Sequence, residues 1–91
     1  MNIVITIPAY NEADTISQVV HEIKKVMSGT KYSYKILVVD DGSSDGTAAL
    51  AKKAGALVYS HTKNYGLAET FKTEIEQCLK LHADIIVHTD A

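Results

Sequence analysis

Two adjacent carboxylates end an apolar run in the segment ILVVDDGSSDGT, which begins at Ile36. Successive strand residues point to opposite faces, so Asp40 and Asp41 are expected to diverge at the end of this strand. One carboxylate, taken as Asp40, is expected to accept backbone N–H groups of the GSSDGT turn. The other, Asp41, is expected to be free to face a ligand crevice. There it can accept hydrogen bonds from the ring N–H or amino groups of uracil or guanine, or from ribose hydroxyls.

The other apolar runs also end in polar side chains. In open α/β sheets, ligands bind beyond the carboxyl ends of the strands, so these positions are candidates for a binding site. A plain structural loop after the first run, and a simple helix start after the third, are the alternative interpretations. The residues are Tyr10, Asn11 and Glu12 after the first run, His61, Lys63 and Asn64 after the third, and Asp90 after the fourth.

The charges at these strand ends favour a divalent cation. The phosphates of a bound nucleotide would meet Glu12, Asp41 and Asp90, and no arginine or glycine-rich cradle. Two like charges 4 Å apart repel by about 1 kcal/mol in bulk water, and by more near a protein surface. Mg²⁺ characteristically uses one or two protein carboxylates together with substrate phosphates. An aspartate at a strand end is therefore a suitable metal ligand.

Strand and helix patterns alternate along the whole chain. Apolar residues at helical spacing from Ile16 to Met27 predict a helix that Asp14 or Thr15 caps and Gly29 ends. Asp45 or Thr47 can cap a second helix through Ala54, ended by Gly55. A third helix is lined by Leu67, Phe71, Ile75, Cys78 and Leu79, which are expected to pack in the core. The strands are expected at 2–7, 35–39, 56–60 and 84–89. Their nearly continuous apolar character is typical of a parallel sheet covered on both faces.

Composition sets further limits. The chain has 91 residues, so one domain over residues 1–91 is expected. A net charge of −2 with scattered lysines argues against a nucleic-acid partner. Cys78 is the single cysteine, which excludes an internal disulfide, fits a core position and favours a cytoplasmic location. We expect neither a signal peptide nor a membrane span, because the longest apolar runs are far short of the ~20 residues that a span needs.

Several other site classes are excluded by their missing signatures. The chain has no G-x-G-x-x-G after its first strand and no G-x-x-x-x-G-K-[ST] motif, so dinucleotide and P-loop sites are not expected. A receiver domain would carry an acidic pair where this chain has IPAYNE. The histidines lack metal-ligand spacing and are expected to be ordinary surface or core residues.

The motifs together resemble the amino-terminal part of family 2 glycosyltransferases with the GT-A fold. Within that family, the motifs resemble more narrowly the dolichyl-phosphate and polyprenyl-phosphate sugar transferases. The resemblance implies a Rossmann-like, three-layer α/β/α fold with a parallel sheet in the strand order 3-2-1-4. It is carried by IPAYNEADTI at 7–16, VVDDGSSDGT at 38–47, NYGLAET at 64–70 and HTDA at 88–91.

The resemblance also implies a function. The reaction would transfer a sugar from a GDP- or UDP-sugar to an acceptor, with a polyprenyl phosphate at a membrane surface as the implied acceptor and Mg²⁺ or Mn²⁺ as cofactor. Asp90 would be the metal ligand and the first acid of the D-x-D element. The second acid, the acceptor site and the catalytic base would fall past Ala91, so these residues alone are expected to be inactive. The residues implied to contact the nucleotide are Pro8, Tyr10, Glu12, Val39, Asp41, Asp90 and Ala91.

Two alternatives to an active enzyme stay open from the sequence, a non-catalytic nucleotide-binding module and an inactive remnant. The strand order adds one expectation about association. The fourth strand would pair on one side only with the first, and an apolar edge strand is a template for pairing with a second chain. The isolated chain is therefore expected to associate with itself through this edge.

Overall fold

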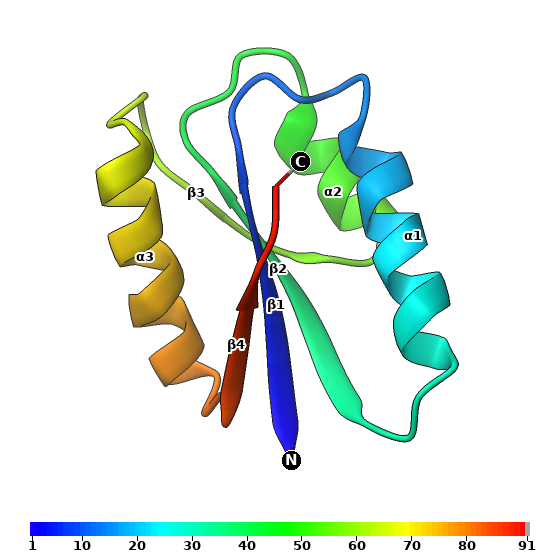
Figure 1. The fold of residues 1–91 in the computed structure, drawn as a ribbon. Coiled ribbons are helices and arrows are strands. Elements are labelled where there is room, and N and C mark those ends of the chain that lie inside the picture. The colour runs from blue at the N-terminus through cyan, green and yellow to red at the C-terminus, as the bar shows by residue number, and fades with distance from the viewer. Residues whose placement is uncertain (91) are drawn as a thin grey trace.

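The computed structural model describes residues 1–90 and shows a parallel sheet between two layers of helices (Figure 1). The sheet order is β3-β2-β1-β4, and every neighbouring pair is parallel. Helix α3 covers one face, and α1 and α2 cover the other (Figure 1). The predicted Rossmann-like α/β class and the order 3-2-1-4 are confirmed. The elements are β1 (Asn2–Ala9), α1 (Ile16–Ser28), β2 (Ser33–Asp40), α2 (Thr47–Ala54), β3 (Leu57–Ser60), α3 (Leu67–Lys80) and β4 (Ile85–His88).

The two central strands are the most buried part of the chain. β1 and β2 pair in register from Asn2 opposite Ser33 to Ala9 opposite Asp40. Their runs of β-branched residues suit a sheet that is covered on both faces, because such side chains pack well on a pleated surface. The pairing brings Asp40, the last residue of β2, level with the end of β1. The loops that follow these strands therefore start at the same edge.

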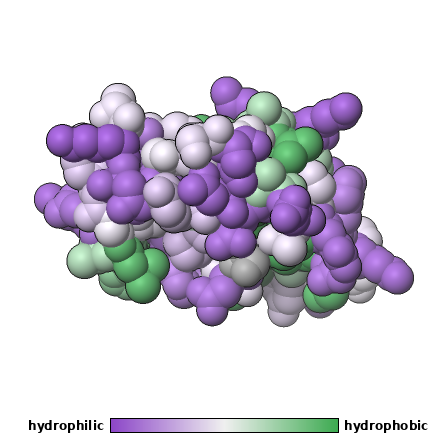
Figure 2. Space-filling view, turned by 90° about the horizontal axis from the view of Figure 1, so that it is seen from above, coloured by the Kyte–Doolittle hydropathy of each residue, from purple (hydrophilic) through white to green (hydrophobic). Residues whose placement is uncertain are grey.

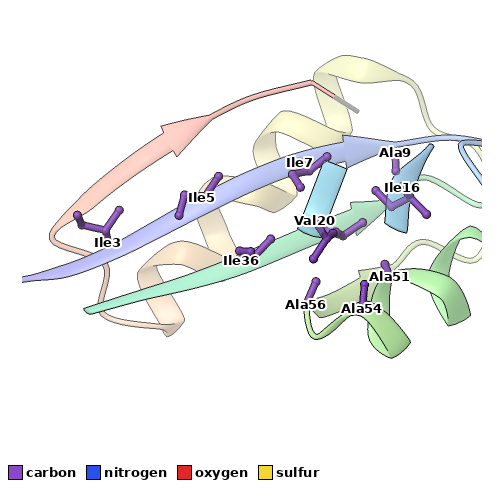
Figure 3. Close-up of a cluster of buried hydrophobic side chains, with 11 residues drawn as sticks. Ile3, Ile5, Ile7, Ala9, Ile16, Val20, Ile36, Ala51, Ala54 and Ala56 are labelled. Atoms are coloured by element: carbon purple, nitrogen blue, oxygen red, sulfur yellow. The ribbon is translucent and has the colours of Figure 1, made fainter. Parts of the chain in front are cut away.

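The larger hydrophobic cluster lies between the sheet and α1 and α2 (Figure 3). Ile7, Ile16 and Val20 are completely buried there. Ile16 and Val20 are four residues apart and so share one face of α1. Ala51 and Ala54 of α2 are small enough for this short helix to lie close to the sheet. This packing fixes the start of α1, and with it the loop between β1 and α1.

Helix α3 packs against the sheet through a different stripe from the one expected. Its buried residues are Thr70, Glu74 and Cys78, which are four residues apart. The prediction that Leu67, Phe71 and Leu79 are core residues is wrong, since they are 71%, 51% and 69% exposed. This polar stripe can be buried because its members have hydrogen-bond partners, with Glu74 2.8 Å from His88 on β4 and the Thr70 hydroxyl donating to the Gly66 carbonyl at 2.9 Å. The core position expected for Cys78 is confirmed, beside Val4, Leu37 and Val39.

The helix starts also differ in detail from the predicted caps. Thr15 is the N-cap of α1 but its side chain makes no capping bond, and the carbonyl of Glu12 accepts the N–H groups of Thr15 and Ile16 instead. At α2, Gly46 holds the N-cap position, while Asp45 accepts the N–H of Thr47 at 3.2 Å. Gly55 ends α2 with a φ of 106°, as its conformational freedom predicts. Within residues 1–90, no helix has the length and hydrophobicity to cross a bilayer.

Candidate functional site

The carboxyl ends of all the strands lie on one edge of the sheet, at the top of Figure 1. Figure 2 looks onto this edge and shows a largely hydrophilic surface with small hydrophobic patches. A cavity of about 340 Å³ opens there. Most of the predicted contact residues line it, namely Pro8, Tyr10, Glu12, Asp41 and Asp90. Ala9, Asn64, Gly66, Leu67 and Thr70 complete the lining.

Two predicted contact residues do not fall among the lining residues. Val39 is completely buried and packs with Cys78 on the α3 side of the sheet. Any contact from this position to a ligand would use its backbone and not its side chain. Ala91 lies outside the described residues.

Asp41 is the most heavily bonded carboxylate of the site. Its Oδ1 atom lies 2.8 Å from His61 Nδ1 and accepts the N–H of Tyr65 at 2.9 Å. Its Oδ2 atom accepts the Asn64 amide at 3.1 Å and the N–H of Gly66 at 2.9 Å. Both oxygens are thus filled by the loop between β3 and α3. Asp41 builds one wall of the cavity by holding that loop.

The pKa of Asp41 reflects this environment. Burial acts to raise the pKa of the carboxyl, but the hydrogen bonds from His61, Tyr65 and Gly66 outweigh burial. The pKa of Asp41 is therefore lowered from its usual value. The charged form is the one that the loop stabilises.

The expected division of roles between the two adjacent aspartates needs correction. Asp40 does accept the N–H of Ser43 at 3.2 Å, so it contributes to the turn as predicted. Asp41 is not free, because protein donors occupy it on both oxygens. The donors come from residues about twenty positions later in the chain, so the local sequence around Asp41 does not predict these hydrogen bonds. Both aspartates are buried structural residues, and Asp41 also lines the cavity.

The turn after β2 also holds the loop after β1. Asn11 donates its N–H to Ser43 Oγ at 2.8 Å, and Asn11 Oδ1 accepts the N–H of Ser44 at 2.9 Å. Glu12 donates its N–H to Thr47 Oγ1 at 3.0 Å, and Ala13 donates to Asp45 Oδ2 at 3.1 Å. Tyr10 and Glu12 are therefore positioned by the GSSDGT segment. Sequence reasoning assigned Asp45 and Thr47 only to helix capping and missed this second role.

Gly42 allows two loops to come into direct contact. Its φ is 75°, and a Cβ atom at this position would lie 2.7 Å from the backbone nitrogen of Asn64. No side chain fits such a distance, so only glycine lets the turn after β2 pack against Lys63 and Asn64. This contact closes the wall that Asp41 holds.

Two of the four histidines, His61 and His88, make side-chain hydrogen bonds within the fold. His61 bridges Asp41 to Thr73 on α3, with 2.7 Å between Nε2 and Thr73 Oγ1. His88 pairs with Glu74, whose pKa is raised because burial disfavours its charge more than His88 and Thr6 favour it. Among residues 1–90, no three His, Cys, Asp or Glu side chains come together as a metal site.

Comparison with known protein families gives a match over nearly the whole chain. The model for glycosyl transferase family 2 matches residues 4–91. An uncharacterized protein of Methanocaldococcus jannaschii is 39% identical over 98% of this chain and 35% of its own length. The undecaprenyl-phosphate 4-deoxy-4-formamido-L-arabinose transferase of Pseudomonas fluorescens is 31% identical over 96% of this chain and 26% of its own length. The chain thus spans about a quarter to a third of these relatives.

Solved structures of GT-A glycosyltransferases share the fold. A mannosyltransferase from Pyrobaculum calidifontis in complex with GDP-Man and Mn²⁺ superposes with a TM-score of 0.77, at 27% identity over 97% of this chain and 26% of that one. Glucosyl-3-phosphoglycerate synthase from Mycobacterium tuberculosis, in complex with Mn²⁺, UDP and its product, also has a TM-score of 0.77, at 27% identity over 98% of this chain and 33% of that one. The family match and these likenesses agree with the motifs and with the sheet order. The chain belongs to glycosyltransferase family 2.

Proposed function

We propose that this chain forms the donor site of an enzyme that transfers a sugar from a nucleoside diphosphate sugar to an acceptor. The observation that carries the proposal is the cavity at the strand ends, where residues from separate loops meet. The aromatic ring of Tyr10 is exposed and could stack on a nucleotide base, and polar side chains line the cavity beside Tyr10. The solved relatives bound to GDP-Man and to UDP support a nucleotide as the ligand.

The charge of the cavity supports a divalent cation at the diphosphate. Glu12, Asp41 and Asp90 are carboxylates in the lining, and no lysine is among the lining residues. A diphosphate would be repelled there without a cation between the charges. Asp90 is exposed at the end of β4, where one protein carboxylate and the substrate phosphates could share Mg²⁺ or Mn²⁺. This donor set fits a metal that is held together with its substrate.

Asp90 is thus the residue that we propose as metal ligand. A bound cation would neutralise charge on the leaving diphosphate. The Mn²⁺ found with two solved relatives supports a divalent cation as cofactor. The remaining residues of the cavity bind and orient the nucleotide.

We propose a polyprenyl phosphate as the acceptor. The support is the relative from Pseudomonas fluorescens, which is named for transfer to undecaprenyl phosphate. The synthase from Mycobacterium tuberculosis has glucosyl-3-phosphoglycerate in its structure, which offers a small phosphorylated acceptor as the competing choice. An assay that includes both acceptors separates the two.

The test begins with binding of GDP and UDP to the purified protein by calorimetry, with and without Mn²⁺. Binding of at least one nucleotide, strengthened by Mn²⁺, is expected. Asp90→Asn should remove most of the Mn²⁺ effect, whereas Asp14→Asn, an exposed control outside the cavity, should retain it. Transfer of labelled sugar to polyprenyl phosphate or to 3-phosphoglycerate then identifies the acceptor. Absence of nucleotide binding would overturn the proposal. Binding without transfer is the result expected if the acceptor site and the catalytic base lie past Ala91, and it would leave the proposed donor site standing.

A further inference from the structure

We infer that Asn64 selects the base of the donor, with its Oδ1 atom accepting a hydrogen bond from the ring N–H of uracil or guanine. The inference rests on the proposed function, since it names the group that reads the nucleotide. Asn64 lines the same cavity as Tyr10 and Asp41. Nothing in the sequence distinguishes Asn64 from the other polar residues of its loop.

The orientation of the Asn64 amide is fixed by what surrounds it. Its Nδ2 atom lies 3.1 Å from Asp41 Oδ2 and 3.4 Å from the Asp41 carbonyl oxygen. Both of these oxygens are acceptors only, so the NH₂ group and not the amide oxygen must face them. Within residues 1–90, the side-chain hydrogen bonds of Asn64 use Nδ2 alone. The amide oxygen is therefore the polar atom of this side chain that a ligand can use.

Asp41 itself has little capacity left for a ligand. Its two oxygens have contacts with His61, Asn64, Tyr65 and Gly66. A carboxylate accepts about four hydrogen bonds in favourable geometry. A base that donated to Asp41 would have to displace one of these protein donors. Asn64 can accept from a base without breaking any of its own contacts.

The backbone around Asn64 is also held in place. On one side it packs directly against the turn at Gly42. A Cβ atom at Gly42 would lie only 2.7 Å from the backbone nitrogen of Asn64, so the two segments are in close contact. On its other side, Tyr65 and Gly66 donate to Asp41 at 2.9 Å each. A preorganised acceptor loses little freedom on binding and so discriminates well between ligands.

The chemistry of the bases gives the expected selectivity. Uracil N3 and guanine N1 carry a proton and can donate to Oδ1, whereas cytosine N3 and adenine N1 are acceptors. Methylation of uracil N3 or guanine N1 removes the donated proton and leaves Oδ1 unpaired, which costs binding energy. The methylated nucleotide should therefore bind more weakly than the natural one.

The test compares UDP with 3-methyl-UDP, and GDP with 1-methyl-GDP, by calorimetry in the presence of Mn²⁺. The wild-type protein should bind its preferred nucleotide about tenfold more tightly than the methylated form. Asn64→Ala should bring the two affinities together. Lys72→Ala, a change in an exposed residue of α3 outside the cavity lining, should keep the wild-type ratio.

The ratio separates recognition from a structural role. A variant that only loosened the loop would weaken both forms of the nucleotide equally and leave the ratio unchanged. Binding of UDP or GDP with a ratio near one in the wild type, or with an unchanged ratio in Asn64→Ala, would overturn the inference but not the proposed function. Absence of binding by every nucleotide would overturn the proposed function and the inference with it.

Discussion

His61 joins Asp41 to Thr73, with 2.8 Å between Nδ1 and the carboxylate and 2.7 Å between Nε2 and the hydroxyl. Because a carboxylate only accepts, Nδ1 carries the proton of the first bond, and Nε2 of a neutral ring accepts from Thr73. The residue after β2, the loop after β3 and helix α3 are thereby connected. One wall of the cavity is therefore a single hydrogen-bonded unit.

Replacing Asp41 should destabilise the protein more than replacing Asp40. Asp41→Asn removes an acceptor from buried N–H groups and should lower the free energy of unfolding by about 1–3 kcal/mol. Asp40→Asn is the matched control, since the contact seen for its carboxylate is the N–H of Ser43 at 3.2 Å. Urea denaturation of both variants measures the difference. A larger loss in Asp40→Asn would restore the roles expected from sequence.

The contribution of Asp41 to stability should disappear in acid. Its pKa is lowered in the folded protein, because hydrogen bonds from His61 and from the N–H groups of Tyr65 and Gly66 outweigh burial. The stabilisation is then complete above the unfolded value of about 3.9 and is lost as the pH falls through the lower folded value. The difference in unfolding free energy between wild type and Asp41→Asn should shrink from pH 6 to below about pH 3. Asp14→Asn provides the exposed control. If the difference in unfolding free energy between wild type and Asp41→Asn did not change with pH, the prediction would be wrong.

Gly42 and Gly46 offer a direct test of the contact between loops. Both have positive φ values, 75° and 86°, but a Cβ at Gly42 would clash with the backbone of Lys63 and Asn64, whereas a Cβ at Gly46 would meet open space. Gly46→Ala should cost about 1–2 kcal/mol from backbone strain alone. Gly42→Ala should cost more and should also weaken nucleotide binding. Chemical denaturation and calorimetry of the pair check this, and equal losses would show that the contact is unimportant.

The edge of the sheet at β4 is expected to make the 91-residue chain associate with itself. Ile85, Ile86 and Val87 are 41%, 39% and 44% exposed, and β4 pairs with β1 on one side within the described part of the chain. An exposed apolar edge favours strand pairing between molecules. Light scattering should detect association that Ile86→Lys reduces and that Tyr32→Lys, in an exposed loop, does not. A strictly monomeric chain would contradict the prediction.

The sequence predicted the elements better than the contacts between them. The continuous apolar runs around Ile5 and Val38 are typical of strands that are buried on both faces. This local pattern is sufficient to predict the parallel sheet. The prediction that Leu67, Phe71 and Leu79 of α3 are buried is wrong, because the buried Glu74 makes its contacts with Thr6 of β1, 68 residues earlier, and with His88 of β4, 14 residues later.

In the candidate site, too, local motifs were easier to interpret than contacts between distant loops. Pro8, Tyr10 and Glu12 line the cavity, and the family resemblance indicates them as nucleotide contacts because they stand in the IPAYNE motif. The roles of Asn64 and Gly42 depend on a loop contact that forms only after β2 and β3 are paired. Long-range contacts of this kind leave no periodicity in the sequence.

The position of β1 also has a consequence for how the molecule assembles. β1 comes first among the described strands, yet it lies in the middle of the sheet, and Asn2 bonds to Asp84 across 82 residues of chain. Pairings this distant close slowly, so β1 stays paired with β2 alone until β4 has been made. During that interval the edge of β1 that β4 will cover has free N–H and C=O groups, which can pair with a strand of another molecule. Wrong pairing between molecules should therefore be most frequent before β4 joins the sheet.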